Sequence, residues 1–118
     1  MKILRNSLIA LSIAVNASPS FAQQVTVVCK SSWSSSNNLS PQEAADETFT
    51  FDLRENKVIT GGDAYVLDSI SPSNITWKEG SFKVSFNRDS LTGHALWQTG
   101  EVFSAFDYAP CKIMPHRF

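Results

Sequence analysis

The stretch Glu47-Thr48-Phe49-Thr50-Phe51-Asp52-Leu53 decides the fold class of this chain. Large apolar residues alternate there with polar ones, and a period of two is typical of a β-strand with one buried face. The next segment, Arg54–Lys57, has the polar composition of a hairpin loop, and a second apolar run follows at Val58–Thr60. These residues therefore predict a β-hairpin.

The same pattern of short apolar runs and turn residues continues to the end of the chain. Further runs cover 65–67, 75–77, 82–86, 95–99, 101–108 and 111–114, and an earlier one covers Val25–Cys29. Short strands spaced by about ten residues, with turn signals between them, are typical of antiparallel all-β folds. We predict a small closed barrel or sandwich of about eight strands.

One segment departs from the β pattern. Ser40-Pro41-Gln42-Glu43 has the form of a capping box, with a serine at the N-cap, a proline at the first helical position and a glutamate that reaches back. Only Ala44, Ala45 and Asp46 follow before the strand pattern resumes. We therefore expect at most one short helix, over Pro41–Asp46.

The first 22 residues have the anatomy of a secretory signal peptide. Lys2 and Arg5 precede a short apolar run at Leu8–Val15, and Ser20-Phe21-Ala22 supplies the small residues of a cleavage site. The apolar run is too short to span a bilayer. The sequence thus predicts a signal peptide over 1–22 and a single β domain over 23–118, located in the periplasm or secreted.

The charge of the predicted mature chain excludes several partners. It holds eight Lys and Arg residues against eleven Asp and Glu residues, a net charge of −3, with the two signs interspersed. No basic patch is available for phosphates, so we expect no nucleic acid and no anionic membrane surface as partner. No second apolar run could insert into a membrane. Another protein is the partner class that remains, and the oligomeric state stays open.

Two cysteines stand near the two ends of the predicted mature chain, Cys29 and Cys111. In an exported protein such a pair is expected to form a disulfide, which here would join the first strand to the last. The alternative is two free thiols or a metal pair.

The sequence carries no recognisable catalytic or metal motif. His94 and His116 are the only histidines, and no zinc-binding motif, nucleophile elbow or phosphate-binding glycine loop is present. Ser90, His94 and either Asp89 or Asp107 could be drawn as a triad, but short polar residues form such triples around any hairpin. We expect a non-enzymatic protein without cofactor or metal, with His94 at the surface near a strand start.

Aromatic residues are the other candidates for function. Most should lie in the core, namely Phe49, Phe51, Phe82, Phe86, Phe103, Phe106 and Trp77. Trp33, by contrast, sits in a Ser- and Asn-rich stretch that is expected to be a loop. Trp97 follows Leu96, so one of the two must face outward. Either tryptophan could pack against the domain or contact a partner.

The segment Asn87–Gly93 is expected to form a hairpin loop. Gly93 would take the positive φ of the turn, Asp89 or Ser90 would bond to the loop backbone, and Arg88 would pair with a carboxylate. The loop could simply stabilise the hairpin, or it could join the two tryptophans in a contact surface. The candidate binding surface comprises Trp33, Arg88, Asp89, Thr92, Gly93 and Trp97.

Three short elements resemble a pattern of small secreted proteobacterial proteins to which no activity is assigned. They are Ile75-Thr76-Trp77, Asn87-Arg88 with Thr92-Gly93, and Pro110-Cys111. The pattern reads I-x-W, N-R-x-T-G and a terminal cysteine, and this chain has two residues inserted in the hairpin. The resemblance implies a compact β domain and no particular activity.

A second resemblance is to the periplasmic inhibitors of C-type lysozyme, which are eight-stranded barrels. Trp77-Lys78-Glu79-Gly80 is similar to their W-x-K-G turn, but their inhibitory Ser-Gly-x-x-Tyr loop has no counterpart, and Ser69-Ile70-Ser71-Pro72 stands in its place. We expect an exported binding or interaction protein. The alternatives are a lysozyme inhibitor and a small-ligand carrier.

Overall fold

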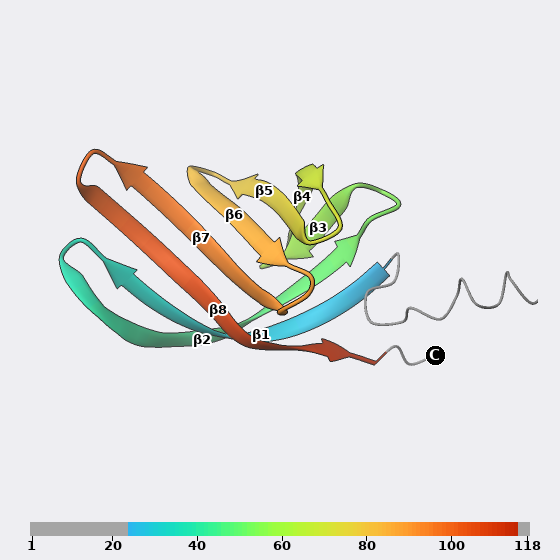
Figure 1. Ribbon diagram of the computed structural model, residues 1–118, viewed down its shortest axis with the longest axis horizontal. Coiled ribbons are helices and arrows are strands. Elements are labelled where there is room, and N and C mark those ends of the chain that lie inside the picture. The colour runs from blue at the N-terminus through green and yellow to red at the C-terminus, as the bar shows by residue number, and fades with distance from the viewer. Residues whose placement is uncertain (1–23, 116–118) are drawn as a thin grey trace, which may run out of the picture.

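A computed structural model describes residues 24–115, which form a closed barrel of eight antiparallel strands with no helix among them (Figure 1). The strands are β1 (Gln24–Ser35), β2 (Asn38–Asp52), β3 (Lys57–Thr60), β4 (Asp63–Ile70), β5 (Asn74–Glu79), β6 (Phe82–Asn87), β7 (Thr92–Thr99) and β8 (Val102–Met114). Each strand pairs with the next, and β8 closes the barrel against β1. The predicted all-β barrel is confirmed. In the described part of the chain no helix could cross a membrane.

The barrel interior is filled by rings from facing strands. Phe51 lies 5.1 Å from Phe86 and 5.6 Å from Trp77 between ring centroids, and Phe49 lies 5.8 Å from Trp77. Burying each such side chain contributes roughly 2–3 kcal/mol. Three phenylalanines expected in the core are only partly buried, namely Phe82, Phe103 and Phe106.

The short helix expected at Pro41–Asp46 does not form, because this segment belongs to β2. Pairing with β1 overrides the local capping signal: Gln42 lies opposite Trp33, and Ala44 opposite Ser31. Pro41 falls where the β1–β2 register shifts, between the Trp33 and Ser35 pairs. A proline at such an irregularity costs no regular ladder hydrogen bond, so the strand tolerates it.

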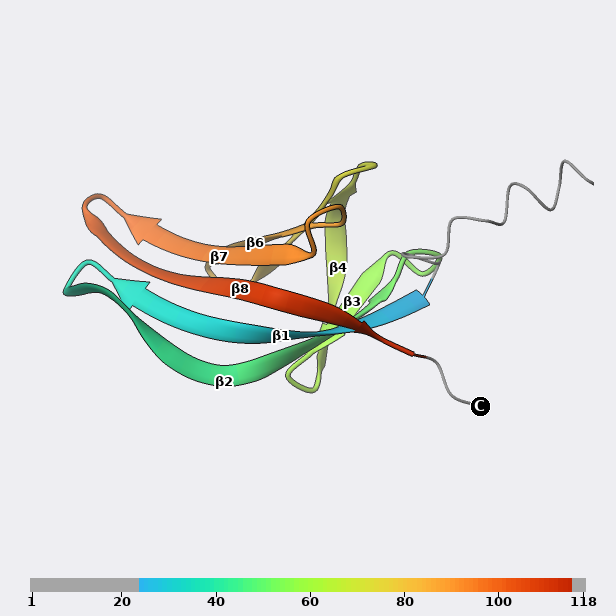
Figure 2. The same ribbon diagram turned by 60° about the horizontal axis from the view of Figure 1, so that its bottom comes forward.

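The β1–β2 and β7–β8 hairpins are longer than the other two hairpins at the same end of the barrel. Beyond the β3–β4 and β5–β6 turns they continue together as a four-stranded sheet in the order β2-β1-β8-β7 (Figures 1 and 2). The β1–β8 pairing holds this sheet together as far as Ser35 opposite Ser104. We call residues 32–46 and 97–106 the extended wall.

A disulfide joins Cys29 of β1 to Cys111 of β8, as the sequence predicts. The two residues are direct cross-strand partners, with their Cα atoms 4.0 Å apart. Just beyond them toward the extended wall, the β1 pairings shift register on both sides, between Cys29 and Ser31. The disulfide fits a protein of an oxidising compartment, such as the periplasm or the extracellular space. Residues 1–22, the predicted signal peptide, lie outside the described residues.

Candidate functional site

Trp33 and Trp97 lie on the same face of the extended wall. Trp33 of β1 is directly opposite Phe106, and Trp97 of β7 is directly opposite Ser104, so the two indoles flank β8 from its two sides. Ser104, Phe106 and Tyr108 are every second residue of β8 and so share one face, and Tyr108 is buried in the barrel core. This face is therefore the continuation of the barrel's inner surface. Trp33 lies in a strand, not in the loop expected from its polar neighbours.

The two tryptophans belong to a partly exposed group of aromatic side chains. The Phe106 ring lies 5.8 Å from that of Phe82 and stacks parallel to that of Tyr108 at 6.2 Å. Trp33 and Trp97 are half-buried, and within residues 24–115 neither indole N–H has a hydrogen-bond partner. We call Trp33, Trp97 and Phe106 of the extended wall, together with Phe82 of the adjoining β6, the aromatic face.

Two carboxylates lie at the base of the aromatic face, where it meets the barrel interior. Glu79 accepts a hydrogen bond from the Trp77 indole at 2.8 Å, and Glu47 accepts one from the Thr60 hydroxyl at 3.0 Å. Each stands two residues from a core residue of its own strand, Glu47 from Phe49 and Glu79 from Trp77, and so points inward. Neither has an ion-pair partner in the described part of the chain. We call Glu47 and Glu79 the acidic pair.

The electrostatics of this region agree with that placement. Burial raises the pKa of the Glu79 carboxyl, the Trp77 hydrogen bond opposes this, and the Glu47 charge adds to the rise. Burial also raises the pKa of Tyr108, followed by the charges of Glu79 and Glu47. Glu79 and the Tyr108 hydroxyl are thus poorly solvated, and Glu47 lies close enough for its charge to act on both.

The loop after β6 does not reach the aromatic face. Arg88, Asp89, Thr92 and Gly93 lie at or beside the β6–β7 turn, and β7 carries the chain from there to the extended wall at the other end of the barrel (Figure 1). The Arg88 guanidinium donates a hydrogen bond to the Ser71 carbonyl at 2.7 Å, next to the β4–β5 turn. The structure therefore brings Trp33 and Trp97 together but places the loop residues elsewhere.

The loop is also built differently from the expectation. Leu91, not Gly93, takes the positive φ, at 56°. The Asn87 side chain, not Asp89 or Ser90, caps the turn by accepting hydrogen bonds from the backbone N–H of Asp89 at 2.9 Å and of Ser90 at 2.8 Å. Gly93 lies within β7. The segment Asn87–Gly93 thus stabilises the β6–β7 hairpin, and Gly93 allows close packing of its neighbours.

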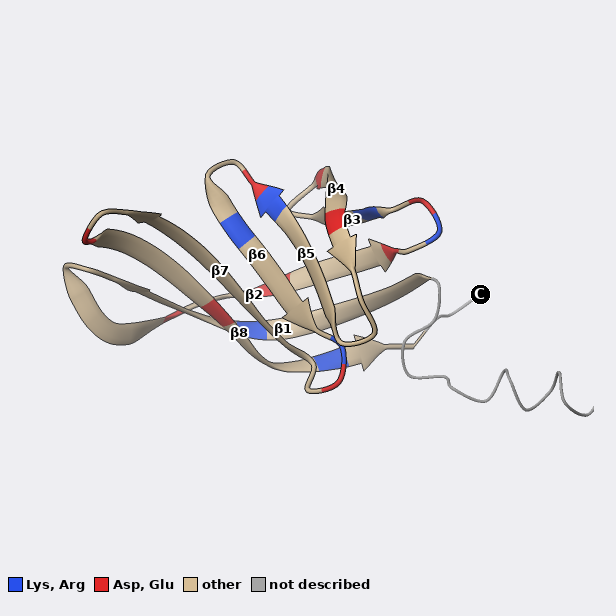
Figure 3. Ribbon diagram, turned by 45° about the horizontal axis from the view of Figure 1, so that its top comes forward, with Lys and Arg blue, Asp and Glu red and all other residues tan. Residues whose placement is uncertain are grey.

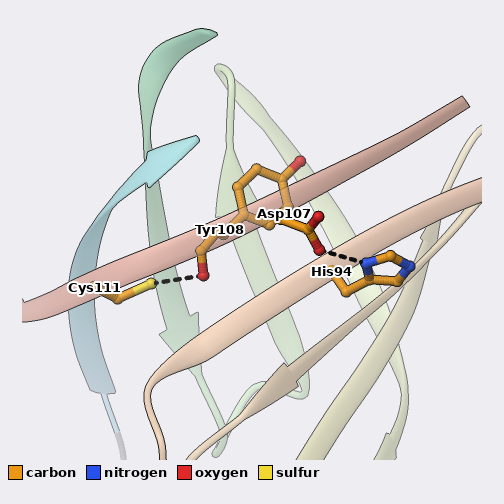
Figure 4. A network of polar contacts seen from close by, with 4 residues as sticks. All are labelled: His94, Asp107, Tyr108 and Cys111. Carbon is orange, nitrogen blue, oxygen red and sulfur yellow. Dashed lines mark hydrogen bonds and ion pairs between the residues drawn. The ribbon is translucent and has the colours of Figure 1, made fainter. Parts of the chain in front are cut away.

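His94 lies on the outer face of β7 and binds Asp107 of β8 with 2.8 Å between Nδ1 and Oδ1 (Figure 4). The side chains of His94 and Asp107 are 48% and 61% exposed, as expected for a surface histidine. Ser90, the serine of the triad considered from the sequence, lies in the β6–β7 turn, where its hydroxyl forms a hydrogen bond with the Thr92 hydroxyl at 2.8 Å. Within residues 24–115 no serine hydroxyl forms the hydrogen bond to His94 that a nucleophilic triad requires.

Shallow grooves run along this outer face. One of about 420 Å³ passes between Lys83, Leu96 and His94, and one of about 360 Å³ passes between Asn87, His94 and Asp107. Figure 4 also marks Cys111 Sγ, 3.5 Å from the Tyr108 carbonyl oxygen. This is a close contact only, since a disulfide sulfur has no hydrogen to donate. In the described chain no group of three or more His, Cys, Asp or Glu side chains could hold a metal ion.

Sequence reasoning missed the acidic pair, although a signal for it exists. Glu47 stands two residues before Phe49, and Glu79 two residues after Trp77, so each continues an apolar, inward-facing row with a charge. Comparison of the chain with models of protein families, with curated proteins and with solved structures finds no match.

Proposed function

We propose that this protein is an exported, non-enzymatic binding domain whose partner contacts the aromatic face of the extended wall. The observation that carries this proposal is the placement of Trp33 and Trp97 on one inner face, half-buried and without a hydrogen-bond partner for either indole N–H among residues 24–115. Tryptophan is enriched among residues that dominate binding energy, because it offers a large apolar surface together with a hydrogen-bond donor.

The shape of the extended wall supports the same role. A barrel needs only enough strand length to close around its core, yet β1, β2, β7 and β8 run on past the turns of their neighbours. The extra length adds an open sheet whose inner side no other described strand covers (Figure 2). An open apolar face of this kind is typical of a surface for another macromolecule.

The test compares two double variants of the full protein. Trp33→Ala with Trp97→Ala removes the two indoles, whereas Ile59→Ala with Val66→Ala removes exposed apolar surface from the outer face of β3 and β4. A partner isolated with the wild-type protein from the periplasm or medium is purified and titrated against each by calorimetry. We expect at least about 30-fold weaker binding to the tryptophan variant and unchanged binding to the outer-face control.

A second variant tests the same face in case the tryptophan variant does not fold. Ser104→Arg places a long side chain opposite Trp97 without removing any ring. It should weaken binding of the partner as strongly as loss of the two tryptophans does. Equal binding by all three variants, or no partner whose retention depends on the tryptophans, overturns the proposal.

Inhibition of C-type lysozyme is the alternative function that one observation favours. The closed eight-stranded barrel is the architecture that the resemblance implies. The segment Ser69–Pro72, at the place of the missing inhibitory loop, ends β4 and enters the β4–β5 turn, at the end of the barrel away from the aromatic face. A lysozyme assay decides: potent inhibition that survives loss of both tryptophans would favour the inhibitor.

The small-ligand carrier receives less support. A carrier needs an internal cavity, whereas rings from β2, β5 and β6 fill the space between the strands of this barrel. The grooves of the outer face are open and shallow.

A further inference from the structure

We propose that the partner presents a basic segment to the extended wall, with a Lys or Arg side chain at the acidic pair and neighbouring residues against the aromatic face. This inference rests on the proposed function and adds the chemistry of the partner. It follows from where the charges of this chain lie.

The inner surface of the described chain carries carboxylates but no Lys or Arg side chain. The seven Lys and Arg residues of the described chain all lie on the outer face or in turns: Lys30, Arg54, Lys57, Lys78, Lys83, Arg88 and Lys112. The extended wall itself holds three carboxylates, Glu43, Asp46 and Glu101, and no Lys or Arg (Figure 3). Of these three, Asp46 has an ion-pair partner, Lys30 at 3.9 Å. The end of the molecule that bears the aromatic face is therefore anionic.

The acidic pair is held ready for a cation. Glu47 and Glu79 are each oriented by a hydrogen bond from a neighbouring side chain, Thr60 and Trp77, which leaves further acceptor capacity on each carboxylate. A guanidinium offers five donors in a planar fork and so suits this arrangement. Its charge would also relieve the repulsion between the two carboxylates.

The aromatic face suits the rest of such a segment. Indole and phenyl faces attract a Lys or Arg head and pack against its methylene stem. A protein segment is favoured over a small amine because the site is an open sheet face and not an enclosed pocket, the form that small ligands prefer. A second copy of this chain is less suitable, since its own Lys and Arg side chains are scattered over the outer face.

The test uses a short peptide, Gly-Ser-Leu-Arg-Ser-Leu-Arg-Leu-Ser-Gly, and a twin in which citrulline replaces each arginine. Citrulline keeps the shape and removes the charge. The indole N–H signals of Trp33, Trp97 and Trp77 are followed by nitrogen-15 NMR of the full protein. We expect the arginine peptide to shift the Trp33 and Trp97 signals, and the twin to bind at least about tenfold more weakly.

Two protein variants complete the design. Glu47→Gln with Glu79→Gln keeps both hydrogen-bond acceptors and removes the two inner charges, and it should weaken the arginine peptide at least about tenfold. Glu55→Gln with Asp68→Asn removes two exposed charges outside the wall and should leave binding unchanged. Weakening by both variants alike would show only general charge attraction and would overturn the inference.

The outcomes separate this inference from the proposed function. If both peptides shift the Trp33 and Trp97 signals with equal affinity, the wall binds but does not select a cation. If neither peptide shifts them and no partner depends on the tryptophans, both proposals fail. A concentration-dependent dimer that loss of Trp33 and Trp97 abolishes would assign the face to a second copy, which also overturns the basic segment.

Discussion

Gly93 of β7 lies directly opposite Tyr108 of β8, and the missing side chain of the glycine makes room for the tyrosine ring. A Cβ at position 93 would stand 3.2 Å from Tyr108 Cδ2 and 3.3 Å from Phe86 Cδ1. Both distances are shorter than an ordinary carbon–carbon contact. The small residue thus lets the two rings reach the core from neighbouring strands.

Gly93→Ala should therefore destabilise the protein by about 1–3 kcal/mol, because the added methyl group overpacks a filled interior. Urea unfolding measures the change. In a Tyr108→Leu background the same substitution should cost less, since one of the two rings that the methyl group meets is gone. An alanine variant as stable as the wild type would contradict this account of Gly93.

Reducing the Cys29–Cys111 disulfide should lower the free energy of unfolding by about 4 kcal/mol. The bond closes a loop with a sequence separation of 82 residues, and constraint of a loop of this length in the unfolded chain accounts for the magnitude. Urea unfolding with and without reductant measures the difference. Titration of the unreduced, unfolded protein should find no free thiol, whereas two thiols would contradict the bond.

Asn87→Ala should destabilise the protein by about 1 kcal/mol, because the Asn87 carboxamide oxygen accepts hydrogen bonds from two backbone N–H groups of the β6–β7 turn. Asn74→Ala is the matched control, since in the described chain the side chain of Asn74 makes no hydrogen bond. We expect that control to change the stability by less than about 0.5 kcal/mol. Equal effects in thermal unfolding would contradict the role of Asn87.

Glu79→Gln should make the protein more stable at neutral pH. The folded-state pKa of Glu79 lies above its ordinary value of 4.5. Protonated Glu79 therefore adds to the free energy of unfolding in full below pH 4.5, and this contribution is lost as the pH rises through the folded-state pKa. The glutamine keeps the acceptor for Trp77 without the charge. The stability gap between variant and wild type should close as the pH falls below 4.5, and a gap that stays constant would contradict the raised pKa of Glu79.

The strand pattern was readable because each strand of the barrel alternates its burial with a period of two. The Phe49 and Phe51 row of β2 is the clearest case, and the cysteine pair followed from the compartment. The β1–β2 half of the extended wall was not readable, because residues 31–48 are mostly polar and their strand state depends on pairing with distant partners such as Phe106. The capping signal at Pro41 failed for the same reason: it is local, and the pairing of β1 with β2 outweighs it.

The positions of the strand ends determine how this molecule would sit on a tether. β1 begins and β8 ends side by side, with Thr26 opposite Met114, at the end of the barrel away from the extended wall. An anchor attached through either Gln24 or Met114 would therefore leave the tryptophans pointing away from the support. Immobilised in this way, the protein would present the extended wall to the surrounding solution, at the end of the molecule farthest from the support.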